Sequence, residues 1–486
     1  MQETTVQKKP KKALINISKK TFLQVLCLLA AMLIVSAILT YVIPRGAFGA
    51  AIGEDGKETV DYSVYLPRED LSGVSPVKAI FAPVLVFASG DGLALLMLSL
   101  FLFVISAAFQ VMNDVGGVRA LIGGVSEKFK NRRGLLLVLV SFLFYCFGSF
   151  LGLFEEMLTM LPIVAVLCLS LGYDSFTGFL CCIIACGFGF AGAVTNPFTV
   201  LYASQIIGVN PMEKIWFRLI VFAVMFLLFL AFLFFYLRRI AKHPEASYTF
   251  THDKALREQM TAGAEESVDP TAQARARRVY AIFLSAALGL IVLCSSISVL
   301  RDYTVPVLIA YFLLCGVGAG MLVSKSPKKV FASFGKGFLA ALPTIVIIAF
   351  AASVKYVFAE GSVFPTIVHW INTLAAGKNP IAVALIIYLI VLLLEFFISS
   401  STAKAVLVMG LLAVANVGLS KEMLVLLYTF ADGYTNVLFP TSPVLLLSLS
   451  MIEIDYFKWI KKSWWLFLVN FALVIGFILL AVGIGY

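Results

Sequence analysis

The sequence predicts an all-α membrane protein made of inverted repeats, in which each repeat carries a re-entrant helical hairpin and a discontinuous transmembrane helix. Hydrophobic residues make up 61% of the 486 residues and charged residues 13%, and the mean hydropathy is +0.99. These values are far from those of soluble domains. Long apolar runs recur along the chain, and four of them are interrupted by polar residues, glycine or proline.

The apolar runs predict nine membrane crossings. A helix rises about 1.5 Å per residue, so about 20 apolar residues cross the hydrocarbon core. The expected crossings occupy residues 21–43, 91–113, 177–207, 215–237, 279–300, 305–324, 340–360, 423–451 and 464–485. The first run lacks a small-residue cleavage site, so we expect it to be a retained span and not a signal peptide.

Two further apolar runs, 134–171 and 380–417, are too long for one crossing. Each contains a polar stretch near its middle, GLFEEMLT in the first and SSSTAK in the second. We interpret each run as a hairpin that enters and leaves the membrane on one side. Irregular backbone at that depth is tolerated only beside protein or a water-filled cavity. Both hairpin tips are therefore expected to line a cavity.

Two of the nine crossings carry helix-breaking residues in their middle. The crossing 177–207 contains GFGFAGAVTNPF, and the crossing 423–451 contains ADGYTNVLFPTSP. Glycine weakens a helix, and proline removes an amide and disfavours helical geometry at the preceding residue. The expected helix-breaking residues are Gly187, Gly189, Gly192, Pro197, Gly433, Pro440 and Pro443. Simple kinks in packed helices are the alternative, but both stretches also share a Thr-Asn pair between glycine and proline, at Thr195-Asn196 and at Thr435-Asn436.

Basic residues predict the orientation. With the N-terminus inside, the inner segments hold 26 of the 37 Lys and Arg and the outer segments hold 8; Arg218, Lys355 and Lys404 lie within apolar runs. The reverse orientation would invert this bias, so the N-terminus is expected in the cytoplasm and the C-terminus outside. The net charge of +10 is spread over these short segments and forms no continuous basic face. It therefore indicates membrane lipid as a partner and argues against nucleic acid.

The order of elements predicts two halves. Residues 1–240 form the first repeat, 241–278 a cytoplasmic linker and 279–486 the second repeat. In each half a hairpin is followed by an interrupted crossing and then by a plain one, and the two hairpins start on opposite sides of the membrane. Inverted repeats with unwound helices are typical of secondary transporters, which bind solute near the bilayer midplane.

Other classes of protein find little support. The eight cysteines lie in apolar runs without metal-ligand spacing, so we expect no metal site. No GxxxxGK[ST] motif is present, which argues against ATP-driven transport. An intramembrane enzyme would need a nucleophile with a base, a HExxH pair or facing aspartates, and we find none of these. We therefore expect no enzyme activity and no cofactor. A channel remains an alternative that a steady single-channel current would support.

The motifs GLFEEMLTMLPI, LGYDSFTGF, GFGFAGAVTNPFTV and ADGYTNVLFPTSPVL resemble those of the YfcC-like branch of the anaerobic four-carbon dicarboxylate carrier family, within the ion transporter superfamily. The resemblance extends over nearly the whole chain. It implies a homodimeric scaffold in the bacterial cytoplasmic membrane and a transport domain that moves as an elevator. It also implies exchange of basic amino acids. At the second hairpin tip the family has Ser, Gly and Gln, whereas this chain has Ser399–Thr402 followed by Lys404.

Ionisable residues deep in apolar runs are candidate functional residues because their burial in a membrane is costly. Glu155 and Glu156 are adjacent, so their side chains diverge by about 100° on a helix, and we expect one to face the substrate. Acidic groups with helix N-termini suit an amino acid, and in particular a cationic one. The expected substrate-binding residues are Glu155, Glu156, Thr195, Asn196, Ser400, Ser401, Thr402, Asp432, Thr435, Asn436, Thr441 and Ser442.

Ion coupling is expected at Lys404, Glu155 or Asp432. The ammonium group of Lys404 could replace a coupling cation, whereas the carboxyl groups could carry a proton; sodium and proton both stay open. We expect Glu395 to pair with Lys355 or with an interfacial group. The main alternative substrate is a four-carbon dicarboxylate, although a dianion would be repelled by Glu155, Glu156 and Asp432 unless Lys404 or a bound cation compensates.

Overall fold

The computed structural model describes residues 19–52, 58–70, 72–90, 92–121, 132–262, 270–301, 303–398, 400–415 and 417–486. In the first half the elements are α1 (Lys19–Val42), β1 (Gly46–Ile52), β2 (Glu58–Pro67), α2 (Pro76–Leu85), η1 (Val86–Ala88), α3 (Gly92–Asp114), α5 (Arg133–Cys146), η2 (Phe147–Leu151), α6 (Met157–Ser170), α7 (Ser175–Phe179), η3 (Leu180–Ile184), α8 (Ala185–Ala191), η4 (Pro197–Leu201), α9 (Tyr202–Ile207) and α10 (Ile215–Lys242). After it come η5 (Pro244–Ala246), α11 (Phe250–Ala262), α12 (Pro270–Ser296), α13 (Ser298–Arg301), α14 (Thr304–Ser324), α15 (Pro327–Ala340), α16 (Leu342–Glu360), α17 (Phe364–Ala375), α18 (Pro380–Phe397), α19 (Ser401–Val414), α20 (Lys421–Gly433), η6 (Tyr434–Val437), α21 (Pro443–Met451) and α22 (Tyr456–Gly483).

Eight helices in the described part of the chain are long and apolar enough to cross a membrane. They lie at Phe22–Val42, Gly92–Asp114, Arg133–Leu151, Ile215–Lys242, Thr304–Ser324, Pro327–Glu360, Pro380–Phe397 and Tyr456–Gly483. The protein is therefore an integral membrane protein. This set differs from the nine expected crossings in three ways. It includes the first arms of the two expected hairpins, and the two interrupted crossings are divided into short helices. The expected crossing 279–300 falls mainly in α12, which is not among the eight.

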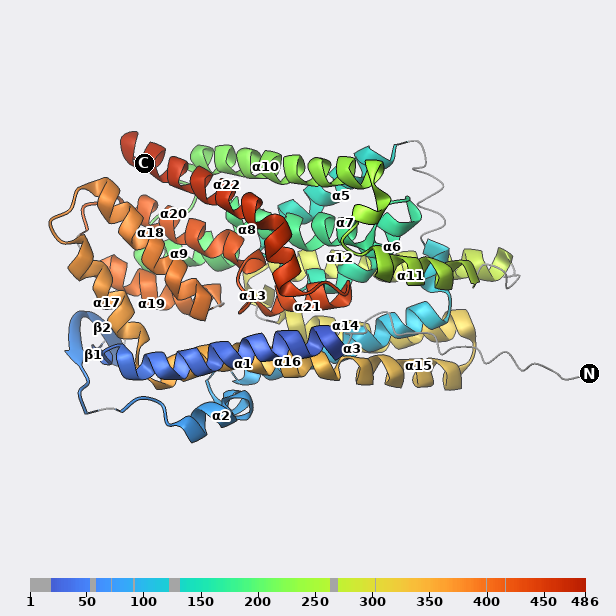
Figure 1. Ribbon diagram of the computed structural model, residues 1–486, viewed down its shortest axis with the longest axis horizontal. Helices are drawn as coiled ribbons and strands as arrows, with labels where there is room; N and C mark the ends of the chain where they lie inside the picture. The colour runs from blue at the N-terminus through green and yellow to red at the C-terminus, as the bar shows by residue number, and fades with distance from the viewer. Residues whose placement is uncertain are drawn as a thin grey trace, which may run out of the picture.

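The helices form two layers that run along the long axis of the molecule (Figure 1). The first, which we call the α3 layer, contains α1, α2, α3, α12, α14, α15 and α16. Each of these helices packs against at least one other helix of the layer. The second, the α8 layer, contains α5 to α10 and α18 to α22. Both layers combine elements of both halves of the chain, so the layers are not the two expected repeats.

A short β hairpin departs from the all-α expectation. Strands β1 and β2 pair antiparallel in the polar stretch after α1, and their register shifts between Phe48 and Gly49. Tyr62 donates a hydrogen bond to the carbonyl oxygen of Val406, and the ring of Tyr65 stacks on His369 at 4.1 Å. The alternation of apolar and polar residues in TVDYSVYL was the available signal, because side chains of a strand alternate between its faces.

The two expected hairpins lie in opposite halves of the long axis, with α5 and α6 in one half and α18 and α19 in the other (Figure 1). The backbone leaves helical geometry between η2 and α6, and again between α18 and α19. In the first hairpin, Arg133 at the start of α5 donates to the carbonyl oxygen of Leu171 after α6, at 2.9 Å. The segment 133–171 thus returns to the level at which it started. At its tip Gly152 has a φ of 69°, a conformation that favours glycine.

The two interrupted crossings pack against each other at their breaks. Helix α8 ends at Ala191, and the chain resumes helical structure at Pro197, where Asn196 caps the new helix. Helix α20 ends at Gly433, where an added Cβ would lie 2.5 Å from the Cα of Ala191. Pro443 starts α21, and Pro440 lies in the connection before it.

Two of the expected break residues have another role. Gly187 and Gly189 lie inside α8 and do not interrupt it. A Cβ at Gly189 would be 2.2 Å from the carbonyl oxygen of Tyr145, and one at Gly187 would be 2.2 Å from Cγ1 of Val437. These glycines therefore allow close approach of neighbouring elements, as small residues do in membrane helix packing.

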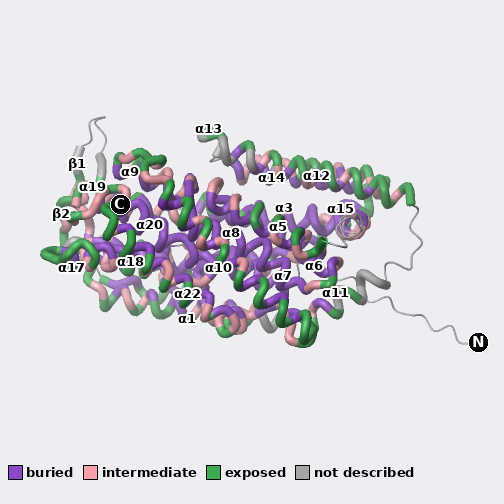
Figure 2. The backbone as a smooth tube through the Cα atoms, turned by 90° about the horizontal axis from the view of Figure 1, so that it is seen from above, coloured by how far each residue is buried: buried purple, intermediate pink, exposed green. Residues whose placement is uncertain are grey.

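The centre of the molecule is α7, η3 and α8, in which every residue is buried. Figure 2 shows this buried stretch enclosed by partly exposed helices such as α10 and α22. A helix that is apolar on all sides is stable only inside a larger bundle. The interruption at Gly192 therefore places backbone polar groups in the protein interior, beside the tip of the first hairpin.

The segment between α10 and α12, the expected linker, is partly helical and contacts the α8 layer through hydrogen bonds. It is shorter than expected, since α10 extends to Lys242 and α12 begins at Pro270. Asp253 of α11 accepts a hydrogen bond from the amide of Ser175 at 2.9 Å, and Lys458 of α22 donates to the carbonyl oxygen of Tyr248 at 2.7 Å.

Candidate functional site

A cavity of about 880 Å³ lies between the two layers. The α3 layer contributes residues of η1, α3, α14 and α16, and the α8 layer contributes both hairpin tips and the second helix break. Its polar and charged lining includes Glu155, Glu156, Lys355, Tyr356, Glu360, Ser400, Ser401, Thr402, Asn436, Thr441 and Ser442. Eight of the sequence-predicted site residues are thus brought together at one cavity.

Glu155 and Glu156 stand at the tip of the first hairpin, just before α6. Glu155 is exposed in the cavity, whereas Glu156 retains 9% of its surface. Glu156 is the N-cap residue of α6 and Glu155 precedes it, so both lie at the helix N-terminus, where the helix dipole favours negative charge. Glu155 is therefore the carboxylate that a solute in the cavity can reach first.

Helix α19 of the second hairpin and helix α21 after the second helix break both begin at the cavity wall. Ser400 caps α19 and accepts from the amide of Ala403 at 3.5 Å, and Ser442 caps α21 and accepts from the amide of Leu445 at 3.4 Å. Both helix N-termini favour an anion. Thr441 adds a buried hydroxyl group that has no hydrogen-bond partner among the described residues.

A lysine that sequence reasoning did not assign to the site also lines the cavity. Lys355 is partly buried on α16 and comes from the α3 layer, across from the hairpin tips. Five residues further along, at the end of α16, Glu360 pairs with Lys78 of α2. The interruption of an apolar run by Lys355 was a signal for a cavity-facing position, but the sequence did not tell which face of α16 meets the other layer.

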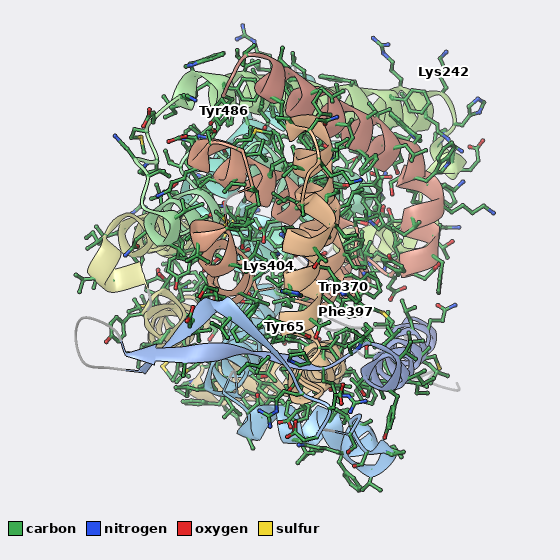
Figure 3. The ribbon with its side chains drawn as sticks, turned by 90° about the vertical axis from the view of Figure 1, so that its left-hand side faces the viewer. Tyr65, Lys242, Trp370, Phe397, Lys404 and Tyr486 are labelled. Atoms are coloured by element: carbon green, nitrogen blue, oxygen red, sulfur yellow. The ribbon has the colours of Figure 1, made fainter. Side chains whose placement is uncertain are left out.

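Lys404 and Asp432 lie behind the cavity wall and not on it. The ammonium nitrogen of Lys404 is 2.6 Å from Oδ1 of Asp432, and it also contacts the carboxylate of Glu395. All three side chains are almost completely buried, with exposures of 0%, 0% and 2%. In Figure 3, which is viewed from the end that carries β1 and β2, Lys404 lies in the interior of the helix bundle. The expected pairing of Glu395 with Lys355 is wrong, because Glu395 and Lys404 face each other across the second hairpin.

Three other predicted site residues hold the backbone and do not line the cavity. Asn196 donates to the carbonyl oxygen of Gly148 at 3.0 Å and accepts from the amides that follow it. Thr195 donates to the carbonyl oxygen of Phe150 at 3.3 Å, and Thr435 donates to that of Asp432 at 3.0 Å. These side chains satisfy the carbonyl groups left free at the breaks, which is obligatory inside a membrane.

Asn436 has both functions. Its amide nitrogen donates to the carbonyl oxygen of Asp432 at 3.0 Å, and the residue is also part of the cavity wall.

Groups of three or more His, Cys, Asp or Glu side chains placed to hold a metal ion are not found among the described residues.

Comparison with known proteins finds a matching family and relatives over most of the chain. Residues 22–483 match the model of a family described as the C4-dicarboxylate anaerobic carrier. YfcC of Escherichia coli (strain K12), which is named as a proposed basic amino acid antiporter, is 26% identical over 397 residues that cover 78% of this chain and 76% of YfcC. An uncharacterised protein of Haemophilus influenzae is also 26% identical, over 79% of this chain and 75% of that protein.

Among solved structures, the YdaH transporter of Alcanivorax borkumensis aligns over 96% of this chain and 99% of its own, with 15% identity and a TM-score of 0.40. The family match covers nearly all of the membrane-embedded chain and includes both hairpins, both helix breaks and the cavity between them. The protein is therefore a membrane transporter that belongs to the C4-dicarboxylate anaerobic carrier family.

Proposed function

We propose that this protein is a secondary active transporter of a small amino acid or carboxylic acid, and specifically an antiporter of basic amino acids. The observation that carries the proposal is the cavity between the layers, in which two hairpin tips and a helix break present charged and hydroxyl groups. Transporters bind their solutes at sites of this kind, near the midplane and beside half-helix N-termini.

The charges of the cavity favour an amino acid. Glu155 and Glu156 offer a place for an ammonium or guanidinium group. The N-termini of α19 and α21 offer a place for a carboxylate, together with Lys355 on the facing layer. A ligand with both charges would be held at both ends, and a second amino or guanidinium group could use the second glutamate. The name of YfcC agrees with this class of substrate.

A four-carbon dicarboxylate is the second candidate. The family description and the position of Lys355 favour it, because a lysine and two helix N-termini together could hold two carboxylates. Glu155 and Glu156 oppose it, since both would repel a dianion at the same cavity.

The two layers suggest how the solute crosses. In the proposed mechanism the α8 layer, with both hairpins, slides against a dimeric scaffold built on the α3 layer, and the two halves of the chain act as inverted repeats. Solute bound at the hairpin tips would then move with the α8 layer from one side of the membrane to the other. The packing of both broken helices within this one layer supports its movement as a unit.

Lys404 is proposed to take the place of a coupling cation at the second hairpin. Its ammonium group occupies the interior of the tip and contacts Asp432, whose carboxylate would otherwise need a cation. Lys404→Gln should therefore make transport dependent on sodium. Unchanged ion dependence in this variant would contradict the proposal.

Reconstituted protein tests the substrate assignment. Vesicles are assayed with labelled arginine, ornithine, lysine, succinate and citrate, with and without counter-substrate and with and without sodium. Exchange of the cationic amino acids is expected, and uptake of the dianions alone would overturn the assignment. Glu155→Gln should reduce exchange at least about tenfold, because a hydrogen bond to a charged group contributes about 1.5–3 kcal/mol. Glu422→Gln, which removes a carboxylate outside the cavity, serves as the matched control.

A further inference from the structure

Three ionisable side chains from three helices meet inside the second hairpin. Glu395 comes from α18, Lys404 from α19 and Asp432 from α20. Lys404 contacts both carboxylates, so the three residues form one cluster, which we call the triad. The triad contains two carboxylates and only one ammonium group.

The groups around the triad do not supply a second positive charge. On α20, Tyr428 places its ring 5.8 Å from the ammonium nitrogen of Lys404. Tyr388 of α18 shares a hydrogen bond with Tyr434 of η6. Tyr202 of α9 lies near Tyr428 and is also uncharged as a phenol. Among ion pairs between described residues, Lys404 is the only cation within 4.0 Å of Glu395 or Asp432. Lys355, the other lysine of this region, belongs to α16 across the cavity.

An unbalanced charge is unfavourable at this depth, because a buried ion without a partner loses its hydration. We propose that the triad is a proton-binding site that holds one exchangeable proton, and that this proton is carried by Glu395. With the proton bound, one carboxylate and one ammonium remain and the cluster is neutral.

The hydrogen bonds select Glu395 as the carrier. Asp432 accepts from Lys404 at 2.6 Å and from the hydroxyl of Ser401 at 2.9 Å, and both bonds favour its ionised form. Glu395 has one donor among the described residues, the ammonium group of Lys404, which contacts its Oε2. The proton is therefore expected on the carboxylate with fewer donors.

Ser401 connects the triad to the cavity. Its hydroxyl donates to Asp432 while the residue lines the cavity, and its carbonyl oxygen accepts from Tyr428. A solute that accepts the hydrogen bond from the hydroxyl of Ser401 would remove one of the two hydrogen bonds that keep Asp432 ionised. Solute binding would then shift the proton within the triad. This coupling rests on the proposed transport function, whereas proton binding itself does not.

Infrared difference spectroscopy of the purified full-length protein tests the proton site without transport. Between alkaline and neutral pH a carboxylic-acid carbonyl band should appear. Glu395→Gln should remove this band. Asp432→Asn should remove it too, because Glu395 then ionises to balance Lys404. Glu422→Gln, on the same helix as Asp432, should leave it in place. A band that persists in both triad variants, or its absence from the unaltered protein, would overturn the site.

Transport assays separate the coupling from the function. Counterflow of labelled arginine at equal pH reports exchange alone, and uptake driven by a pH step reports coupling to protons. We expect both activities in the unaltered protein and a counterflow rate in Glu395→Gln that no longer changes with pH. Counterflow without any response to a pH step would contradict the coupling and leave the proposed function intact. Absence of both counterflow and pH-driven uptake in the unaltered protein would contradict the proposed function.

Discussion

Lys404 shows how much depends on one side chain in this protein. A lysine is costly in a membrane interior, yet this one is completely buried because two carboxylates surround it. Its contacts also join α18, α19 and α20, so the charge has a structural role in addition to any role in transport.

Replacing Lys404 with methionine should destabilise the protein by about 3–5 kcal/mol, because it leaves the buried carboxylate of Asp432 without its cation. Thermal unfolding in detergent measures the change. The triple variant Glu395→Gln/Lys404→Met/Asp432→Asn is the control, and it should recover most of the loss because no charge then remains buried. Equal unfolding temperatures for Lys404→Met and the unaltered protein would show that the ion pairs do not stabilise the hairpin.

The buried Asp253 of α11 should make the free energy of unfolding depend on pH. Burial raises the pKa of Asp253 above its ordinary value, against the opposing effect of hydrogen bonds from Ser175 and Thr249. The folded state therefore binds this proton more tightly than the unfolded state does, and Asp253 stabilises the fold as the pH falls from neutral through its raised pKa. The unfolding free energy of the unaltered protein should rise relative to that of Asp253→Asn over this range.

Asp70 provides a control of opposite sign. It is exposed, and a hydrogen bond from Arg68 lowers its pKa. Its contribution is present above the unfolded pKa and is lost as the pH falls, so Asp70→Asn should deviate from the unaltered protein in the other direction and only slightly. A parallel response of the two variants would refute the assignment of the effect to burial of Asp253.

At the scale of elements, the broken helices depend on close backbone approach. Helix α8 is surrounded by protein on all sides, and glycines let it touch the first hairpin on one face and the second break on another. The same residues that look like helix breakers in the sequence thus act as contact surfaces in the fold. Only Gly192 and Gly433 lie where the helices end.

Gly189→Ala should therefore destabilise the α8 layer by about 1–3 kcal/mol, since the added methyl group meets the backbone of Tyr145 at 2.2 Å and cannot be accommodated by a rotamer change. Gly318→Ala is the matched control. Gly318 is also inside an apolar helix, but its Cβ would meet nothing within 4 Å, and alanine is the better helix former. Unfolding temperatures of the two variants in detergent measure the difference. An equal loss of stability in both variants would contradict the prediction.

At the scale of the whole molecule, the polar ends of the long axis relate the fold to the membrane. Helix α11 lies at one end, and β1, β2 and α17 lie at the other (Figure 1). Helix α10 has 28 residues and spans about 42 Å, which is longer than the hydrocarbon core. From the distribution of Lys and Arg we propose that the end with α11 faces the cytoplasm.

Single cysteines test this orientation in a background without the native cysteines. Lys254→Cys on α11 should react with a membrane-impermeant thiol reagent only after the cells are opened. Lys378→Cys, in the connection between α17 and α18, should react in intact cells. Both positions are exposed, so access decides the outcome. The reverse pattern would invert the proposed topology.

Much of the helix pattern follows from the sequence. The run 134–171 became α5, η2 and α6 at Arg133–Ser170, and the run 380–417 became α18 and α19 at Pro380–Val414. Both interrupted crossings lose helical geometry within the stretches marked by glycine and proline. Hydropathy is informative here because a chain in lipid must satisfy its backbone internally, which leaves few alternatives to the helix.

The sequence by itself determined most of the long apolar helices, the stretches in which two of them are interrupted and which ionisable residues lie within apolar segments and so require an explanation. The tertiary structure alone decided which of those residues face one another: Lys404 meets Glu395, Lys355 faces the cavity, and Asn196 holds the backbone of the first hairpin. Burial of a segment depends on its own residues, whereas the direction of a side chain depends on helices that pack against it from distant parts of the chain.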